Sequence, residues 1–148
     1  MNAERFISRG KRLDNGEWVQ GFYADRGEDF KDNCRHLILV SSDRIVGDFE
    51  KIEVNPATIG QCTGIAARKS YRGERPEDLL IFEGDIVKAG RGIHEIVYKN
   101  CCLYAKIKKD DATYYLDIVN LAEKYKAGIR IIGNIHDNPE LLEVNTDE

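Results

Sequence analysis

Two carboxylates flank a glycine at Glu83, Gly84 and Asp85, a pattern that acid–base chemistry can use. Paired carboxylates do such work when their surroundings separate their pKa values, and His94 or His136 would complete a hydrolase. Apolar residues on both sides of the motif favour a structural role instead. They predict a turn into a strand, with a positive φ at Gly84 and an Asp85 side chain bonded to a nearby backbone amide. We therefore assign no catalytic residue.

The four cysteines, Cys34, Cys62, Cys101 and Cys102, are the candidates for metal or disulfide chemistry. No two of them have the Cys-x-x-Cys spacing of metal sites, and a disulfide between the adjacent pair would be strained. The alternative is a metal site that combines Cys34 and His36, two residues apart on one strand, with later Cys or His side chains. We expect four free thiols, no metal and no cofactor.

A basic stretch that also carries tyrosines lies between residues 88 and 130. It contains nine Lys or Arg against five Asp or Glu. Aromatic rings beside cations can bind single-stranded nucleic acid, because bases stack on the rings and phosphates pair with the charges. The alternative is an ordinary solvated face of the fold. The candidate binding residues are Tyr104, Lys106, Lys108, Tyr114, Tyr115 and Arg130.

The elements that would position these residues begin with an N-terminal hairpin. Asn15-Gly16 lies between two runs with strand character, and this dipeptide favours a tight hairpin turn. Three aromatic residues of the hairpin, Trp18, Phe22 and Tyr23, are candidate contacts for a partner. Burial in the core is the alternative, and it is favoured for Trp18.

Further strands are expected before residue 66. The apolar run at residues 37–40 predicts a buried strand, and shorter pieces are expected at residues 45–46 and 52–54. We expect Asn55-Pro56 to form a corner that ends the last piece, because proline cannot donate to a strand ladder and the residue before it is held extended.

A hydrophilic stretch divides the chain. Residues 67–78 are nearly free of apolar side chains and predict a polar connector. The expected organisation is an N-terminal β region at residues 1–66, this connector, and a C-terminal region at residues 79–148.

Five short strands are expected in the C-terminal region, at residues 85–88, 94–98, 103–108, 113–119 and 129–135. The glycine-rich segment at residues 89–92 predicts a hairpin loop, because it lacks the lysine and the following helix of a phosphate-binding loop. Five short strands favour a small barrel, which covers most strand edges. An SH3-like barrel is the natural candidate, and the strand count also admits an OB-like arrangement.

Two short helical segments complete this region. Residues 120–126, just before Gly128, predict a short helix. Asn138 is expected to cap a terminal helical turn, with Pro139 at its first helical position. In this turn, Leu141 and Leu142 are expected to pack down on the barrel and close it.

Three blocks of the chain resemble one family. They lie at residues 54–64, 81–87 and 132–142 and read VNPATIGQCTG, IFEGDIV and IGNIHDNPELL. In this order and spacing they are similar to the YopX family, whose last block often reads IGNIYENPELL, with tyrosine at position 136 and glutamate at position 137. Residues 10–19 match as well. The resemblance therefore covers nearly the whole chain, with gaps at residues 25–50 and 88–128.

The resemblance implies a small protein encoded by bacteriophages and prophages, with no established activity. It also implies an SH3-type barrel in the C-terminal region. The structural residues of the matching blocks are Gly84, Asp85, Gly133, Asn134, Asn138, Pro139 and Leu141.

Composition sets wide limits on function. The chain has 148 residues, 32% of them charged, and a net charge of −4. It is neither strongly basic nor strongly acidic, so its overall charge does not indicate a class of partner. No apolar run approaches the roughly 18 residues of a membrane span, and the first residues lack the apolar stretch of a signal peptide. We expect a cytoplasmic protein that does not contact membranes.

These observations favour a phage or prophage accessory protein that binds without catalysis. The expected partners are a second copy of the chain and a host or phage protein. Small β modules leave edges and aromatic surface that symmetric pairing can cover, so a homo-oligomer is expected. The alternative is a nucleic-acid-binding module that uses the basic, tyrosine-bearing face.

Overall fold

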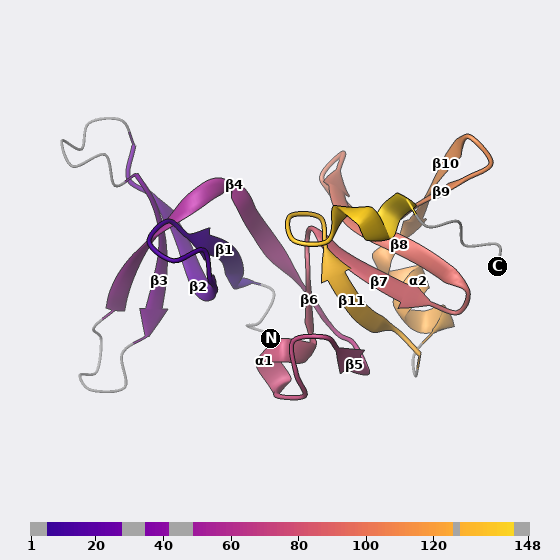
Figure 1. The fold of residues 1–148 in the computed structure, drawn as a ribbon, viewed down its shortest axis with the longest axis horizontal. Helices are drawn as coiled ribbons and strands as arrows, with labels where there is room; N and C mark the ends of the chain where they lie inside the picture. Colours follow the sequence, from indigo (N-terminus) through magenta and orange to yellow (C-terminus); the bar gives the residue numbers. More distant parts are fainter. Residues whose placement is uncertain (1–5, 28–34, 42–48, 126–127, 144–148) are drawn as a thin grey trace. The chain divides into compact units, whose positions relative to one another are not determined.

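The computed structural model describes residues 6–27, 35–41, 49–125 and 128–143. The chain divides into two compact units, Met1–Cys62 and Thr63–Glu148, which we call unit 1 and unit 2 (Figure 1). Strands dominate both units, so the expected mainly β fold is confirmed. The division between the units falls inside one long strand, β4 (Phe49–Ala66). The boundary expected from the sequence, at residue 66, coincides with the end of this strand.

Unit 1 is built from antiparallel strands. They are β1 (Ser8–Arg12), β2 (Trp18–Asp25), β3 (His36–Ser41) and the first part of β4. Each of these strands has two hydrogen-bonded neighbours, because β1 pairs with both β2 and β4 while β3 lies between β2 and β4. Ile38, Ile52 and Val54 form the buried core, since alternate residues of each strand face inward.

The predicted hairpin and buried strand of unit 1 are both confirmed. β1 and β2 pair around a turn in which Gly16 has a φ of 73°. Leu37 and Ile38 of β3 are buried. Trp18 is half-buried, and the guanidinium carbon of Arg9 lies 4.5 Å from the centroid of its ring.

The predicted corner at Asn55-Pro56 is wrong, because β4 continues through both residues. The register of β1 against β4 shifts here, so that Pro56 lies in an irregular stretch where its missing N–H is not needed. The Thr58 hydroxyl replaces a ladder contact: it accepts from the Lys11 N–H at 2.8 Å and donates to the Asn55 carbonyl at 2.7 Å. The strand piece expected at residues 45–46 lies outside the described residues.

In its described residues, unit 2 contains a mixed sheet and three short helical segments. After the end of β4 come β5 (Lys69–Ser70), α1 (Pro76–Leu79), β6 (Leu80–Phe82), β7 (Asp85–Ala89), β8 (Gly92–Lys99), β9 (Cys102–Lys109), β10 (Ala112–Asp117), α2 (Ile118–Lys124), β11 (Arg130–Asn134) and the 3-10 helix η2 (Pro139–Glu143). The sheet order is β10-β9-β8-β7-β11-β5, and only the β11–β5 pairing among these is parallel. The stretch expected to be a polar connector contains β5 and most of α1.

The five strands expected in this region are confirmed as β7 to β11, and the loop at residues 89–92 joins β7 to β8 with Gly90 at a φ of 61°. The expected helix is present but begins at Ile118 instead of residue 120. Asp117 explains the earlier start, because its carboxylate accepts from the Val119 N–H at 2.8 Å and caps the helix.

The core of unit 2 lies on one side of the sheet. Val87, Ile96, Ala105 and Ile131 of the sheet are buried there, in one cluster with Ile81 of β6. The helix α2 contributes two further buried residues to the same cluster. Within the described residues, no helix is long and apolar enough to cross a membrane.

Candidate nucleic-acid interface

The Glu83–Gly84–Asp85 motif forms the turn between β6 and β7, with Gly84 at a φ of 91°, as predicted. The Asp85 side chain is fully buried. Its Oδ2 accepts from the Phe82 N–H at 2.8 Å, and its Oδ1 lies 3.3 Å from Nη1 of Arg72. Both carboxylate oxygens are therefore engaged inside the protein, where they stabilise the turn.

Arg72 connects three parts of unit 2. Its Nη2 donates to the Leu80 carbonyl at 2.7 Å and to the Asp78 carbonyl at 3.1 Å, in addition to the contact with Asp85. A buried carboxylate requires such a cation, because an isolated buried charge is strongly destabilising. No sequence motif singles out Arg72, because its partners lie 6, 8 and 13 positions further along the chain.

Asn134 performs a similar task at the end of β11. The side chain is fully buried, and its Oδ1 accepts from the backbone N–H groups of His136 and Asp137, both at 2.9 Å. Its Nδ2 donates to the Tyr71 hydroxyl at 2.8 Å and to an Asp137 carboxylate oxygen at 3.1 Å. One side chain thus holds the following turn and a distant segment together.

Gly133 allows the side chains of Asn138 and Leu141 to approach the backbone of β11 closely. A Cβ at this position would lie 2.7 Å from both the Asn138 Oδ1 and the Leu141 Cδ1, which is too short for a real contact. The expected terminal helical turn is confirmed as η2, with Pro139 at its start. Asn138 precedes it as predicted, but the Asn138 oxygen accepts from the Asn134 N–H at 3.3 Å.

Only one of the two leucines of η2 packs as expected. Leu141 is half-buried against Gly133, whereas Leu142 is exposed. The expectation for Leu142 is wrong, because successive side chains of a short 3-10 turn point in different directions.

The candidate binding residues lie on β9, β10 and β11, and the strand register decides which of them share a face. Tyr104, Lys106 and Lys108 alternate along β9, so their side chains point to the same side. Tyr115 pairs with Lys106 and therefore points to that side as well. The core residue Ala105 occupies the opposite side of β9. Four predicted residues are thus brought together.

A fifth residue, Lys99, joins them. It pairs with Cys102 across the β8–β9 turn, and its Nζ lies 4.1 Å from the centroid of the Tyr115 ring. The Tyr104 and Tyr115 ring centroids are 6.1 Å apart, with the planes at 75°. We call Lys99, Tyr104, Lys106, Lys108 and Tyr115 the tyrosine–lysine face. Lys99 was not among the residues predicted from the sequence, although its position at a strand end beside a turn could have indicated it.

The two remaining candidates lie elsewhere on the sheet. Arg130 pairs with Lys88 and points to the same side as the tyrosine–lysine face, but β7 and β8 separate it from β9. Three strand spacings amount to about 14 Å. Tyr114 pairs with Ile107 and points to the opposite side, with 57% of its surface exposed.

The side of the sheet that carries these residues is locally positive. Among the described residues that the register places there, six are cations: Lys69, Lys88, Lys99, Lys106, Lys108 and Arg130. The carboxylates there are Glu95, opposite Lys106, and Asp117, opposite Tyr104. The pKa of Tyr104 is raised, first by its electrostatic interaction with Cys102 and then by burial.

The histidines and cysteines do not form a metal centre in the part of the chain that the structure describes. Cys62 is buried, Cys101 and Cys102 are exposed, and none of the three is in a disulfide, whereas Cys34 lies outside the described residues. His94 is buried, and its pKa is lowered by that burial.

Unit 1 has a different exposed surface. Phe22 and Phe49 are 49% and 42% exposed, and their ring centroids are 6.5 Å apart in an edge-to-face arrangement. Tyr23 stacks on His36, and its hydroxyl lies 2.7 Å from the His36 Nδ1. Two of the three aromatic residues predicted as contacts, Phe22 and Tyr23, are therefore exposed.

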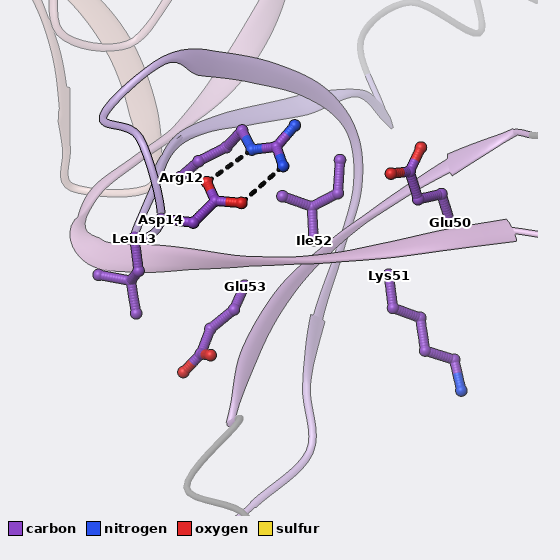
Figure 2. A pocket seen from close by; sticks show the side chains of 7 residues that line it. All are labelled: Arg12, Leu13, Asp14, Glu50, Lys51, Ile52 and Glu53. Carbon is purple, nitrogen blue, oxygen red and sulfur yellow. Dashed lines mark hydrogen bonds and ion pairs between the residues drawn. The ribbon is translucent and has the colours of Figure 1, made fainter.

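A shallow hollow of about 370 Å³ also lies in unit 1. Figure 2 shows Arg12 paired with Asp14, with Glu50 and Ile52 beside them and Glu53 on the other side of the β4 ribbon. The ion pair joins Arg12 Nη2 to Asp14 Oδ2 at 2.7 Å and holds the pKa of Asp14 below its ordinary value. The arginine is thus engaged by Asp14, two positions further along the chain.

The fold and the buried clusters define a class: a small β protein whose sequence motifs hold turns and strand ends in place. The profile of one protein family, described as YopX protein, matches residues 9–143. The chain belongs to the YopX family. No curated protein and no solved structure matches the chain.

Proposed function

We propose that this protein is a non-catalytic binding protein and that its unit 2 binds single-stranded nucleic acid on the tyrosine–lysine face. The observation that carries the proposal is the grouping of Tyr104 and Tyr115, at 6.1 Å, with the Lys99 ammonium 4.1 Å from a ring. The sequence favoured a protein partner over nucleic acid. The grouping of rings and cations on one face now gives nucleic acid the stronger support.

A single strand fits this face better than a duplex. A tyrosine ring stacks on the flat side of a base, and in a duplex those sides are covered by neighbouring base pairs. Stacking on an aromatic side chain contributes about 1–3 kcal/mol per base and tolerates any base. Lys106 and Lys108 lie on the same side as the rings and would contact phosphates. The proposal therefore predicts low sequence specificity.

We also propose that unit 2 is an SH3-like barrel. The support is the strand order β10-β9-β8-β7-β11, in which the last strand returns to pair with β7, the first strand of the meander. The short helix α2 between β10 and β11 is consistent with this topology. In such a barrel the core lies inside, and the tyrosine–lysine face is the outer surface of β8, β9 and β10.

The test is fluorescence anisotropy with labelled single-stranded DNA, duplex DNA and single-stranded RNA, at low and at physiological salt. We expect micromolar or tighter binding of the single strands that weakens as salt rises. Lys106→Glu should lower the affinity roughly tenfold, and adding Lys108→Glu should abolish binding.

The matched control for this experiment is Lys51→Glu, an exposed lysine of unit 1 whose replacement changes the net charge equally. It should bind nearly as well as the unchanged protein. An absence of binding at low salt, or an equal loss in Lys106→Glu and Lys51→Glu, would contradict the proposal.

Self-association is a second candidate function, supported by the exposed pair Phe22 and Phe49. Exposed aromatic clusters are typical of surfaces that contact other proteins. We propose that this pair contributes to a homo-oligomer or to the contact with a host or phage protein, in a cytoplasmic phage or prophage accessory protein.

Sedimentation velocity over a range of concentrations tests self-association. We expect the mean mass to rise with concentration, and Phe22→Ser to suppress that rise. Leu13→Ser is the control, because Leu13 is a similarly exposed apolar residue of unit 1. A monomer mass at every concentration would contradict this second candidate.

A further inference from the structure

We infer that Lys99 exchanges partners when nucleic acid binds: its ammonium moves off the Tyr115 ring, on which a base then stacks, and pairs with a phosphate. This inference rests on the proposed function and assigns a role to a residue that the sequence did not single out. It describes how the tyrosine–lysine face changes between its free and its bound state.

The free state is defined by a cation–π contact. The Lys99 Nζ lies 4.1 Å from the centroid of the Tyr115 ring, well inside the roughly 6 Å over which such contacts act. An ammonium at that distance covers the side of the ring that it approaches. A base that stacks on the same side must displace it.

The position of Lys99 makes the displacement possible without a change of backbone. Lys99 is the last residue of β8, and an exposed two-residue turn, Asn100 and Cys101, follows it. Its side chain is long, flexible and exposed, so the ammonium can move while the strand pairing with Cys102 is kept.

The exchange is favoured by the strengths of the contacts. An exposed cation–π contact is weak, whereas an ammonium paired with a phosphate makes a charge-assisted hydrogen bond. The base also gains the stacking contact with the ring that the ammonium has vacated. After it moves off the ring face, the ammonium stays close to the ring edge, where the backbone of a stacked nucleotide would lie. One lysine thus protects the ring in the free protein and contacts phosphate in the complex.

The test follows Lys99 by NMR in the 148-residue chain. In the free protein, the ring current of Tyr115 should move the Lys99 ε-methylene protons upfield, and Tyr115→Leu should abolish that shift. Saturation with an oligothymidylate of about ten nucleotides should return these protons to ordinary lysine positions. In parallel anisotropy titrations, Lys99→Gln should reduce the slope of log affinity against log salt by about one.

Lys124→Gln is the matched control, because the Lys124 Nζ also lies over a tyrosine ring, 5.4 Å from the centroid of Tyr125, but on α2. In the unchanged protein, the ring-current shift of Lys124 should survive saturation with the oligothymidylate. The Lys124→Gln variant should show the same salt slope as the unchanged protein. Binding with the Lys99 shift intact and the slope unaltered in Lys99→Gln would overturn the inference alone. An upfield shift in the free protein without any oligothymidylate binding would overturn the proposed function and the inference with it.

Discussion

At the scale of single residues, Asp85 holds the turn between β6 and β7. It is fully buried and engages both the Phe82 N–H and the Arg72 guanidinium. Asp85→Ala would remove the carboxylate that accepts from that amide and would leave the largely buried Arg72 cation without its counter-charge. We expect the free energy of unfolding to fall by about 3–5 kcal/mol, measured by urea denaturation.

Asp85→Asn is the informative companion, because an amide oxygen can still accept from Phe82 while the charge opposite Arg72 is lost. Its stability should lie between those of the unchanged protein and Asp85→Ala. Equal stabilities of all three proteins would show that the cluster does not hold the turn.

His94 predicts a dependence of stability on pH. Burial lowers its pKa below the ordinary value of 6.5, so the unfolded chain binds a proton at pH values where the folded chain does not. The contribution of neutral His94 is therefore complete above the ordinary pKa and is lost as the pH falls below it. Between about pH 7.5 and about pH 5, His94→Leu should lose less unfolding free energy than the unchanged protein.

Asp25 also titrates, but in a lower pH range than His94. The ion pair with Arg35 lowers the pKa of Asp25 to about 2, so the contribution of Asp25 to stability is lost only as the pH falls below the ordinary carboxylate range. If both proteins lose equal stability between pH 7.5 and pH 5, the burial of His94 does not govern this window.

Local residue roles followed from the sequence, whereas long-range ones did not. Gly84 and Asp85 act within a single turn, and their roles were predicted from their immediate neighbours. Arg72 and Tyr71 reach partners that only the folded chain brings close, and Tyr71 bonds to Asn134 63 positions away. No local pattern encodes such a contact.

At the scale of elements, the packing of η2 on β11 depends on the missing side chain of Gly133. Gly133→Ala would force a Cβ to within 2.7 Å of Asn138 and Leu141. We expect a loss of about 1–3 kcal/mol in the free energy of unfolding, measured by urea denaturation.

Gly128→Ala is the matched control for Gly133→Ala. A Cβ at Gly128 would have its nearest neighbour at 3.9 Å, the Tyr125 carbonyl oxygen. This variant should be neutral or slightly stabilised, since alanine restricts the unfolded chain. A comparable loss at both positions would contradict the close-approach argument.

The β8–β9 turn carries strain that can be removed. Asn100 and Cys101 have φ angles of 51° and 64°, and a turn of this kind favours asparagine followed by glycine. Cys101→Gly should raise the free energy of unfolding by about 1 kcal/mol in thermal denaturation. Cys101→Ala removes the thiol but keeps the strained backbone, so a gain in that variant as well would point to another cause.

Turn chemistry and strand periodicity explain why most elements could be predicted. Asn15-Gly16 and the loop at residues 89–92 each lie between alternating runs, and both form hairpins. Pro56 was misjudged because the sequence does not show that β4 contains an irregular stretch, in which the Thr58 hydroxyl supplies the missing contact.

At the scale of the whole molecule, a net charge of −4 conceals a positive face on unit 2. Composition alone suggested no nucleic-acid partner. The strand register explains the difference, because it gathers Lys99, Lys106 and Lys108 on one side of the sheet with the two tyrosine rings. No sequence pattern could show which face of β10 would lie beside the lysines and tyrosine of β9.

The central claim is that the tyrosine–lysine face binds single-stranded nucleic acid, and two neighbouring tyrosines of β10 test it most directly. Tyr115 lies on that face and Tyr114 on the opposite one, although both are exposed. The measurement is the affinity of Tyr115→Ala and of Tyr114→Ala for one labelled oligothymidylate, with unchanged thermal unfolding required of both variants.

The account predicts that Tyr115→Ala weakens binding by roughly 5- to 100-fold, the value of one stacked base, while Tyr114→Ala binds like the unchanged protein. Equal affinities of the two variants, whether both are reduced or both are unaltered, would contradict it.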